Sequence, residues 1–364
     1  MGEGVTEGPL TLEELQLATR NRGMPLEALR YDVTPTGVHY LLIHFDIPEI
    51  DPSSWRLEVG GNVDRSLSMT LEDIRARPAT TLPVTMECAG NGRARLFPRP
   101  VSNPWLYEAV GTAEWTGARL ADVLADAGLS PDTVEVVFTG ADHGVQGEVE
   151  QDYERSLTVD DASGPEVLLA YEMNGRPLEP QHGAPLRLLV PGWYGMTSVK
   201  WLTRIEAVTE PFEGYQQAVS YRYQRDEEDP GERVRRIRVR ALMIPPGYPD
   251  FPGRRRFVDA GPVLLRGRAW SGEGDVVRVE VGVDDEWREA ELEPAVGEFA
   301  WRGWSCRWDA EPGEHVLSSR ATDAAGNTQP GEQTWNYQGM GNNWVQTVPV
   351  TVLGAADRAP GASA

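Results

Sequence analysis

The sequence has little cysteine, histidine or lysine, and each shortage excludes a kind of site. Cys88 and Cys306 are the only cysteines, too few to build a zinc or iron-sulfur site from thiolates alone. Five histidines and no Cys-x-x-Cys-His motif exclude a covalent c-type haem, so no haem is expected in this chain. Of the 34 lysine and arginine residues, Lys200 is the single lysine.

Long apolar runs and positive charge are also missing. No stretch of about 18 apolar residues occurs, so no membrane span is predicted. A net charge of −22 argues against nucleic acid or an anionic membrane as a partner. The acidic N-terminus, which lacks the features of an export signal, favours a cytoplasmic location, with export left open if a leader has been removed.

The length and the abundance of turn residues predict a two-domain α+β protein. With 364 residues, the chain exceeds the size of a typical single core, and 38 Gly, 28 Pro and 12 Trp favour strands joined by irregular loops. The patterns predict an N-terminal extension with a short helix (1–30), a mixed α/β domain (31–208), a linker (209–233), an immunoglobulin-like β-sandwich (234–353) and a disordered tail (354–364).

One candidate site surrounds Cys88, in the run Met-Glu-Cys-Ala-Gly-Asn-Gly-Arg that ends at Arg93. A lone buried cysteine is most often an inert apolar side chain. Against this interpretation, the glycines in the run are poor residues for a core strand, and neighbouring arginines would stabilise a thiolate. A metal bound here must bring its other ligands with it.

A second candidate segment supplies cations. His182, Arg187 and Lys200 lie among glycines whose backbone amides could approach a phosphate closely, which suits a phosphorylated organic cofactor. The alternative is a turn between two buried strands whose cations face solvent.

These two segments carry a family resemblance. ECAGNGR resembles the molybdenum-binding loop of the sulfite oxidase family, and LLAYEMNGRPLEPQHGAPLRLLVPGWYGMTSVKW is similar to that family's cofactor-binding segment. HFDIP at 44–48 resembles its pterin-contacting stretch, and WNYQGMGNNWVQTVPVTV resembles its dimer-forming sandwich domain. The resemblance covers about residues 31–353 and implies a sulfite oxidase-like molybdopterin-binding domain.

Carried over position by position, the resemblance implies molybdopterin with one molybdenum and Cys88 as the protein ligand of the metal. Tyr171 matches an active-site tyrosine, Arg93 matches an arginine that faces the substrate, and Trp105 occupies the approximate place of a pocket tryptophan. The implied contacts of the pterin and its phosphate are His44, His182, Arg187, Ser198, Val199 and Lys200.

The pattern departs from the family where anions would bind. Leu42 and Ile43 stand before His44 where sulfite-oxidising members have Arg-Asn, and Glu273 and Asp275 occupy a turn that carries another arginine. Three functions stay open: oxidation of sulfite or a related sulfur compound, reduction of a neutral sulfoxide or N-oxide, and a non-catalytic carrier or interaction protein. The expected partners are a small oxyanion or sulfur compound, a separate electron acceptor (a cytochrome, another redox protein or oxygen), and a second copy of the chain.

Overall fold

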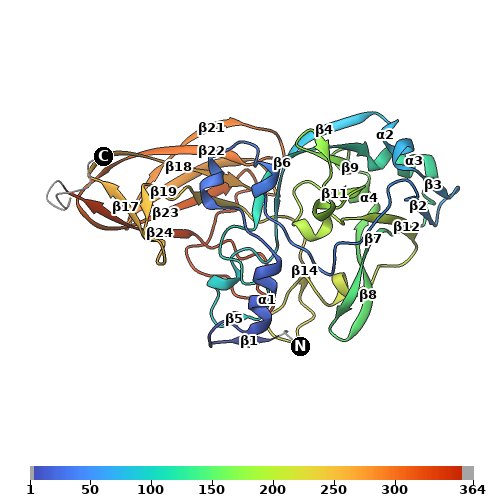
Figure 1. Ribbon diagram of the computed structural model, residues 1–364, viewed down its shortest axis with the longest axis horizontal. Coiled ribbons are helices and arrows are strands. Elements are labelled where there is room, and N and C mark those ends of the chain that lie inside the picture. Colours follow the sequence, from blue (N-terminus) through green and yellow to red (C-terminus); the bar gives the residue numbers. More distant parts are fainter. Residues whose placement is uncertain (1–3, 355–364) are drawn as a thin grey trace. The chain divides into compact units, whose positions relative to one another are not determined.

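The computed structural model describes residues 4–354, which form two compact units (Figure 1). The first unit contains the described residues up to Met24, then Pro35–Ile237 and Trp335–Asn342. The second contains Pro25–Thr34, Arg238–Thr334 and the described residues from Asn343 onward. The tail predicted over 354–364 lies outside the described residues except for its first position.

The helices of the first unit are short, and their starts can be read from the sequence. Thr11 caps α1 and its hydroxyl accepts the Glu14 amide, while the Glu14 carboxylate accepts the Thr11 amide. Glu14 is fully buried and pairs with Arg99 at 2.7 Å, which ties the predicted N-terminal helix to the body of the unit. The helices are α1 (Leu12–Arg20), α2 (Leu71–Arg75), α3 (Leu120–Ala127), α4 (Val159–Ala162) and α5 (Tyr215–Ala218).

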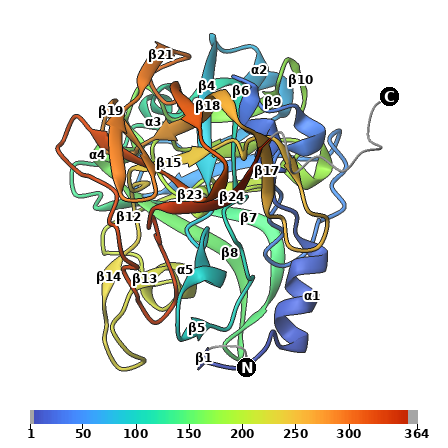
Figure 2. The same ribbon diagram turned by 90° about the vertical axis from the view of Figure 1, so that its left-hand side faces the viewer.

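Two five-stranded sheets make up most of the first unit, and β7 and β8 form its long hairpin (Figure 1 and Figure 2). The first sheet runs β10 (Arg176–Pro177), β9 (Leu168–Met173), β6 (Val110–Arg119) and β4 (Ala79–Glu87), with β11 (Arg187–Leu189) also paired to β9. The second runs β3 (Leu67–Met69), β2 (Leu57–Gly61), β12 (Leu202–Val208), β7 (Glu135–Gln146) and β8 (Val149–Thr158). A two-stranded pair joins β1 (Val5–Thr6) to β5 (Arg99–Pro100).

One apolar core joins the two sheets of the first unit. It contains Leu169 of β9 and Phe138 of β7, together with Leu120 and Leu124 of α3. Gly128 ends α3 in a left-handed conformation with φ 71°, as expected for the glycine after LADVLADA. The core therefore fixes the strand ends from which the site side chains project.

The segment 209–233, for which a linker was predicted, has structure of its own. It contains α5 and the antiparallel pair β13 (Arg222–Tyr223) and β14 (Glu232–Arg233), and it belongs to the first unit. The unit boundary falls between Ile237 and Arg238.

The second unit is a sandwich of two sheets around one core, which confirms the predicted fold class. Its core joins residues of both sheets, including Leu265, Trp304, Val279 and Val350. One sheet runs β15 (Arg240–Met243), β18 (Gly261–Trp270), β22 (Arg302–Ala310) and β21 (Glu291–Ala295). The other runs β16 (Tyr248–Pro249), β17 (Arg256–Asp259), β24 (Gln346–Leu353), β23 (Gly313–Asp323), β19 (Val276–Val283) and β20 (Glu286–Glu289).

Within residues 4–354, none of the helices has the length and apolar character needed to cross a membrane.

Candidate active site

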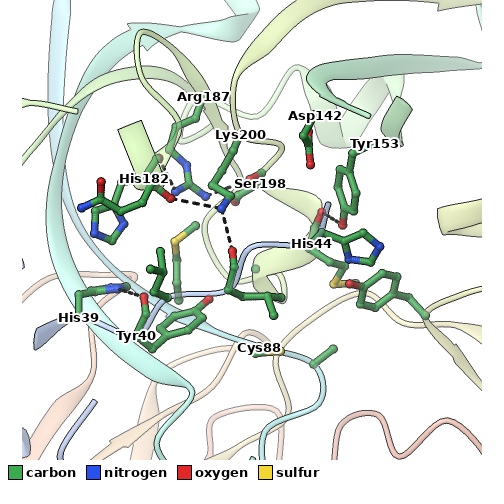
Figure 3. Close-up of a pocket in the computed structure, with 18 residues that line it drawn as sticks. His39, Tyr40, His44, Cys88, Asp142, Tyr153, His182, Arg187, Ser198 and Lys200 are labelled. Carbon is green, nitrogen blue, oxygen red and sulfur yellow. Dashed lines mark hydrogen bonds between the residues drawn. The ribbon is translucent and has the colours of Figure 1, made fainter. Parts of the chain in front are cut away.

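A pocket in the first unit brings together six of the predicted site residues (Figure 3). The space inside it and its open mouth together amounts to about 690 Å³, part of which is open solvent. The predicted residues that line it are His44, Cys88, His182, Arg187, Ser198 and Lys200. Segments more than 100 residues apart in the sequence therefore converge on one pocket.

Cys88 lies directly after β4, at the end of the first sheet. Its amide donates to the Ala109 carbonyl at 2.9 Å, and its own carbonyl accepts the Asn91 amide at 2.9 Å. Burial raises the pKa of the Cys88 thiol, while the charge of Arg93 opposes this effect. Both cysteines are free, so the thiol is available as a ligand.

Arg93 and Trp105 lie beside Cys88 but are not among the residues that line the pocket. The indole of Trp105 hydrogen-bonds the Cys88 thiol. Arg93 is buried, and its guanidinium donates to the Gln338 carbonyl at 3.1 Å and to the Asn103 carbonyl at 3.4 Å. Arg93 thus acts on the thiol through its charge while its nitrogens are held by the main chain.

The cations Arg187 and Lys200 lie at the opposite end of the pocket from Cys88 in Figure 3. Arg187 donates to the Ser198 carbonyl at 2.9 Å and to the His182 carbonyl at 3.0 Å. Lys200 donates to the Leu42 carbonyl at 2.7 Å. Burial lowers the pKa of His182 to about 3 and the pKa of Lys200 to about 7, so Arg187 is the residue that stays fully charged here at neutral pH.

Val199 lies between Ser198 and Lys200 in the chain but packs into the core instead of lining the pocket. Its carbonyl accepts the Leu188 amide at 2.8 Å. It therefore fixes the backbone on which the two neighbouring pocket residues stand.

Asp142 is a pocket residue that the sequence did not indicate. It is 3% exposed, and its Oδ1 has no hydrogen-bond partner among the described residues. Burial raises the pKa of Asp142, and burial lowers the pKa of Lys200, although the two opposite charges attract. An unsatisfied buried acceptor of this kind fits a ligand that carries N–H or O–H groups.

Comparison with known proteins identifies the family of the chain. Residues 44–216 match the oxidoreductase molybdopterin binding domain, and residues 252–353 match the Mo-co oxidoreductase dimerisation domain. Sulfite oxidase from Gallus gallus is 33% identical over 338 residues, covering 85% of this chain and 71% of that protein. The chain belongs to the sulfite oxidase family of molybdopterin-dependent oxidoreductases.

Two further known proteins are similar to this chain. Mitochondrial sulfite oxidase from Mus musculus is 35% identical over 350 residues, and the match covers 87% of this chain but 62% of the mouse protein. The chain therefore spans less than two thirds of that relative. The crystal structure of the sulfane dehydrogenase SoxCD from Paracoccus pantotrophus matches with a TM-score of 0.79 at 27% identity, covering 92% of this chain and 84% of that one.

The cofactor of the chain is molybdopterin with molybdenum, and the side chains of the pocket fit it. Cys88 offers one soft donor to the metal, while Arg187 and Lys200 offer positive charge to a phosphate at the other end. Among residues 4–354, no group of three or more His, Cys, Asp and Glu side chains could hold a metal.

Tyr171, the family match for a catalytic tyrosine, does not lie in the pocket. It belongs to the core of the first unit and lies under the guanidinium of Arg75, 5.3 Å from the ring centre. Its strand, β9, pairs with β6 on one side and β11 on the other, so its side chains are largely buried between neighbours. The position of Tyr171 gives no support to a role at the metal.

Three other tyrosines line the pocket instead: Tyr40, Tyr153 and Tyr221. The charge of Cys88 raises the pKa of both Tyr40 and Tyr221, in addition to the larger effect of burial. Tyr221 has φ 57°, a conformation that a bulky residue adopts at a cost and that is concentrated at functional sites. This backbone strain is visible only in the structure, because Tyr221 lies in the segment predicted to be a linker.

The Asp142→Asn variant is expected to be more stable than the native cofactor-free protein at pH 8. The raised pKa means that the folded state binds a proton on Asp142 more tightly than the unfolded chain, so its destabilising effect is absent near pH 4 and complete above neutral pH. Thermal unfolding should show the Tm gain at pH 8 shrinking toward pH 4, with each kcal/mol worth about 2–4 °C in Tm.

The control for this prediction is Asp309→Asn, the same change at an exposed position on β22. Its Tm should follow that of the native protein at both pH values. An equal Tm gain for Asp142→Asn at pH 4 and pH 8 would show that ionisation of the carboxyl is not the cause.

Proposed function

We propose that the chain is an oxidoreductase that carries out two-electron oxygen-atom transfer and oxidises sulfite or a related sulfur compound. The observation that carries this proposal is the convergence of the Cys88 thiol with Arg187 and Lys200 in one pocket. Sulfite oxidase relatives in mouse and chicken support the oxidative direction. When bound, the molybdenum cofactor supplies the two-electron chemistry that side chains cannot.

In this proposal the chain binds and orients the cofactor. Cys88 ligates the metal, and the Arg187 and Lys200 charges lie where a phosphate can pair with them. The proposed cofactor-binding residues are His44, His182, Arg187, Ser198, Val199 and Lys200, with Asp142 added from the structure. Arg93 and Trp105 set the charge and the hydrogen bonding around the thiol.

We assign the proton-carrying role to Tyr221. Burial, followed by the charge of Cys88, raises the pKa of Tyr221 to about 12, so its Oη keeps its proton at neutral pH and can donate it to a reacting group. Tyr153 donates its own proton to the Met196 carbonyl at 2.9 Å, so in its hydrogen bond with Tyr221 it accepts the Tyr221 proton. The Tyr221 hydroxyl therefore has to turn from Tyr153 toward the reacting group when it donates. These contacts hold the phenol in place beside the thiol.

The Tyr221→Phe variant is therefore expected to keep its cofactor and to lose about 100-fold in kcat, the typical size of a general acid or base contribution. Steady-state turnover and molybdenum content of the same preparation check this expectation. Tyr171→Phe is the matched control, because Tyr171 lies in the core and not in the pocket. Native turnover in Tyr221→Phe, or a similar loss in both variants, would remove Tyr221 from the mechanism.

A second candidate function is reduction of a neutral sulfoxide or N-oxide, and the charges around Cys88 favour it. Arg93 is the cation whose charge acts on the thiol, yet its Nε, Nη1 and Nη2 already bond to Gln338, Asn103 and Met340. Leu42 lines the pocket at the position where sulfite-oxidising family members carry an arginine. The charge of a dianion bound near Cys88 would be poorly compensated, because little positive charge is free to pair with it.

Metal and pterin analysis followed by two turnover assays tests these functions. Sulfite with an artificial acceptor measures oxidation, and a sulfoxide with a reduced dye measures reduction. About one molybdenum per chain with sulfite turnover supports the proposed oxidation. Molybdenum with sulfoxide turnover alone supports the reductase, and molybdenum with neither activity supports a cofactor carrier. Absence of molybdenum after expression in cofactor-producing cells would contradict the whole proposal.

We further propose that the protein forms a homodimer and passes electrons to a separate acceptor. Residues 252–353, which match a dimerisation domain, lie in the second unit. Sedimentation equilibrium of the purified chain checks this, with a dimer expected and a monomer at micromolar concentration opposing it.

A further inference from the structure

Three glutamine side chains of the first unit form a series of hydrogen bonds that begins at the pocket residue His44. We call this series the glutamine chain. His44 Nε2 lies 2.8 Å from Gln146 Oε1 at the end of β7. Gln216 of α5 places its Nε2 2.9 Å from both Gln146 Oε1 and Gln151 Oε1. The Gln151 Nε2 in turn donates to the Val149 carbonyl at 3.2 Å. The glutamine chain is buried at its centre, where Gln216 is 1% exposed.

The exposed hydrogen bond from Gln151 to the Val149 carbonyl gives this series of hydrogen bonds one consistent direction. A carbonyl can only accept, so Gln151 must turn its amide nitrogen toward Val149 and its oxygen toward Gln216. Gln216 must then donate through its amide nitrogen, and Gln146 must accept through its amide oxygen. The placement of oxygen and nitrogen in a single glutamine amide is ambiguous, but here each amide's orientation follows from that of its neighbour.

The direction of the glutamine chain determines which nitrogen of His44 carries the proton. Because Gln146 presents an oxygen, His44 Nε2 must donate a hydrogen. Burial lowers the pKa of His44 to about 4, so the ring is neutral near pH 7 and Nδ1 carries a lone pair. Among residues 4–354, no hydrogen bond to Nδ1 is seen, and the ring lines the pocket.

We infer that Gln146, Gln216 and Gln151 are positioning residues that hold His44 in the Nε2–H form, so that Nδ1 accepts a hydrogen bond from an N–H or O–H group of the pterin. The use of Nδ1 by the cofactor rests on the proposed function. The control of the tautomer does not rest on the proposed function, because it follows from hydrogen bonds among residues of the protein itself.

Substitutions at Gln146 test the inference, because Glu, Lys and Met are similar in length to glutamine but differ in hydrogen bonding. Gln146→Glu offers only acceptors and should preserve the Nε2–H form at pH 8. Gln146→Lys offers only donors and should force the proton to Nδ1. Gln146→Met offers neither and should expose the Nε2–H to exchange with water.

The first readout is the imidazole ¹⁵N spectrum of histidine-labelled protein without cofactor, which contains only five histidines. His44→Gln assigns the signal by its loss. We expect a slowly exchanging Nε2–H signal in the native protein and in Gln146→Glu, its loss in Gln146→Met, and an Nδ1–H signal in Gln146→Lys. Gln217→Met is the control for disturbance of α5, because Gln217 bonds Ser156 and not the glutamine chain.

The second readout is cofactor affinity, measured by molybdenum retained per chain during dialysis at pH 8. Charge alone predicts that Lys strengthens binding of an anionic cofactor and that Glu weakens it. The tautomer model predicts the reverse order, with Gln146→Glu near the native value and Gln146→Lys at least about 10-fold weaker, comparable to losing one hydrogen-bonded partner.

Two results would overturn the inference. A native His44 signal of the Nδ1–H form, or one that Gln146→Lys leaves unchanged, contradicts control of the tautomer. The predicted spectra combined with tighter binding by Gln146→Lys contradict the use of Nδ1 by the pterin. Absence of molybdenum from every variant and from the native protein contradicts the proposed function, while the spectra still decide the tautomer.

Discussion

Cys88→Ser is expected to yield a folded protein whose kcat is reduced at least about 1000-fold, because a hard, protonated hydroxyl replaces the soft thiolate that ligates the metal. Cys88 is 7% exposed at the end of β4, and the side-chain volumes of cysteine and serine are similar. The cost to folding should be about 1–3 kcal/mol, the usual penalty for burying a poorly paired hydroxyl. Turnover of protein with measured molybdenum content checks the prediction.

Cys306→Ser is the matched control for this experiment. Cys306 lies in β22 of the second unit, is 8% exposed and packs in that unit's core, so the substitution repeats the same loss of a buried sulfur. Its Tm should fall by a similar amount while kcat stays at the native value. Turnover by Cys88→Ser comparable to that of Cys306→Ser would contradict metal ligation by Cys88.

The parts of the fold that could be predicted were those set by local patterns. Thr11 and Glu14 form a capping box, which is a local signal for the start of a helix, and Gly128 is a local signal for the end of one. Alternating apolar residues in the second unit bury one face of each strand, which predicts a two-sheet sandwich. Such signals depend on neighbours a few residues away, so a single sequence contains them.

The parts of the site that could not be predicted depend on contacts between distant segments. Asp142 and Tyr153 reach the pocket because of the register between β7 and β8, which includes a bulge between Thr139 and His143. This irregularity sets two extra residues of β7 against β8 and so changes which side chains lie opposite one another, and no local sequence pattern predicts it. Tyr221 precedes an acidic, turn-rich stretch (224–233) that resembles a linker in composition although it packs within the first unit.

Tyr171 shows a different difficulty. The run Leu-Leu-Ala-Tyr-Glu-Met matches a family motif, and that match correctly indicates a buried strand. Apolar residues occupy both faces of such a strand, so the sequence cannot tell which face a tyrosine adopts. Tyr171 lies in the core and Tyr221 lines the pocket, so the motif indicates the strand, and the proposed proton-carrying role goes to Tyr221.

Lys200→Met is expected to weaken cofactor binding by roughly 100- to 4000-fold, because removing one partner from a buried, hydrogen-bonded charge pair costs about 3–5 kcal/mol. Lys200 is the single lysine of the chain, and it donates to the Leu42 carbonyl at 2.7 Å and to the Gln181 carbonyl at 3.3 Å. Its ammonium lies 4.2 Å from the Trp201 ring centre. These contacts hold a cation in place for a phosphate.

The stability of the protein without cofactor should move in the other direction. Burial lowers the pKa of Lys200, so the folded state disfavours its charge, and this cost is present at neutral pH and disappears as the pH rises above the ordinary range of lysine. Lys200→Met should therefore unfold at the same or a higher Tm than the native cofactor-free protein at pH 7. Lys200→Arg keeps the charge and serves as the control, with cofactor retention nearer to native.

Molybdenum retention and the Tm gain on cofactor loading, measured on the same samples, separate a binding role from a folding role for this lysine. A binding role predicts that Lys200→Met loses both the metal and the Tm gain while its cofactor-free Tm is preserved. Native retention by Lys200→Met would place the phosphate away from Lys200 and leave Arg187 as its partner. A Tm loss in the cofactor-free variant would instead mean that the lysine's hydrogen bonds to the Leu42 and Gln181 carbonyls stabilise the fold more than its buried charge destabilises it.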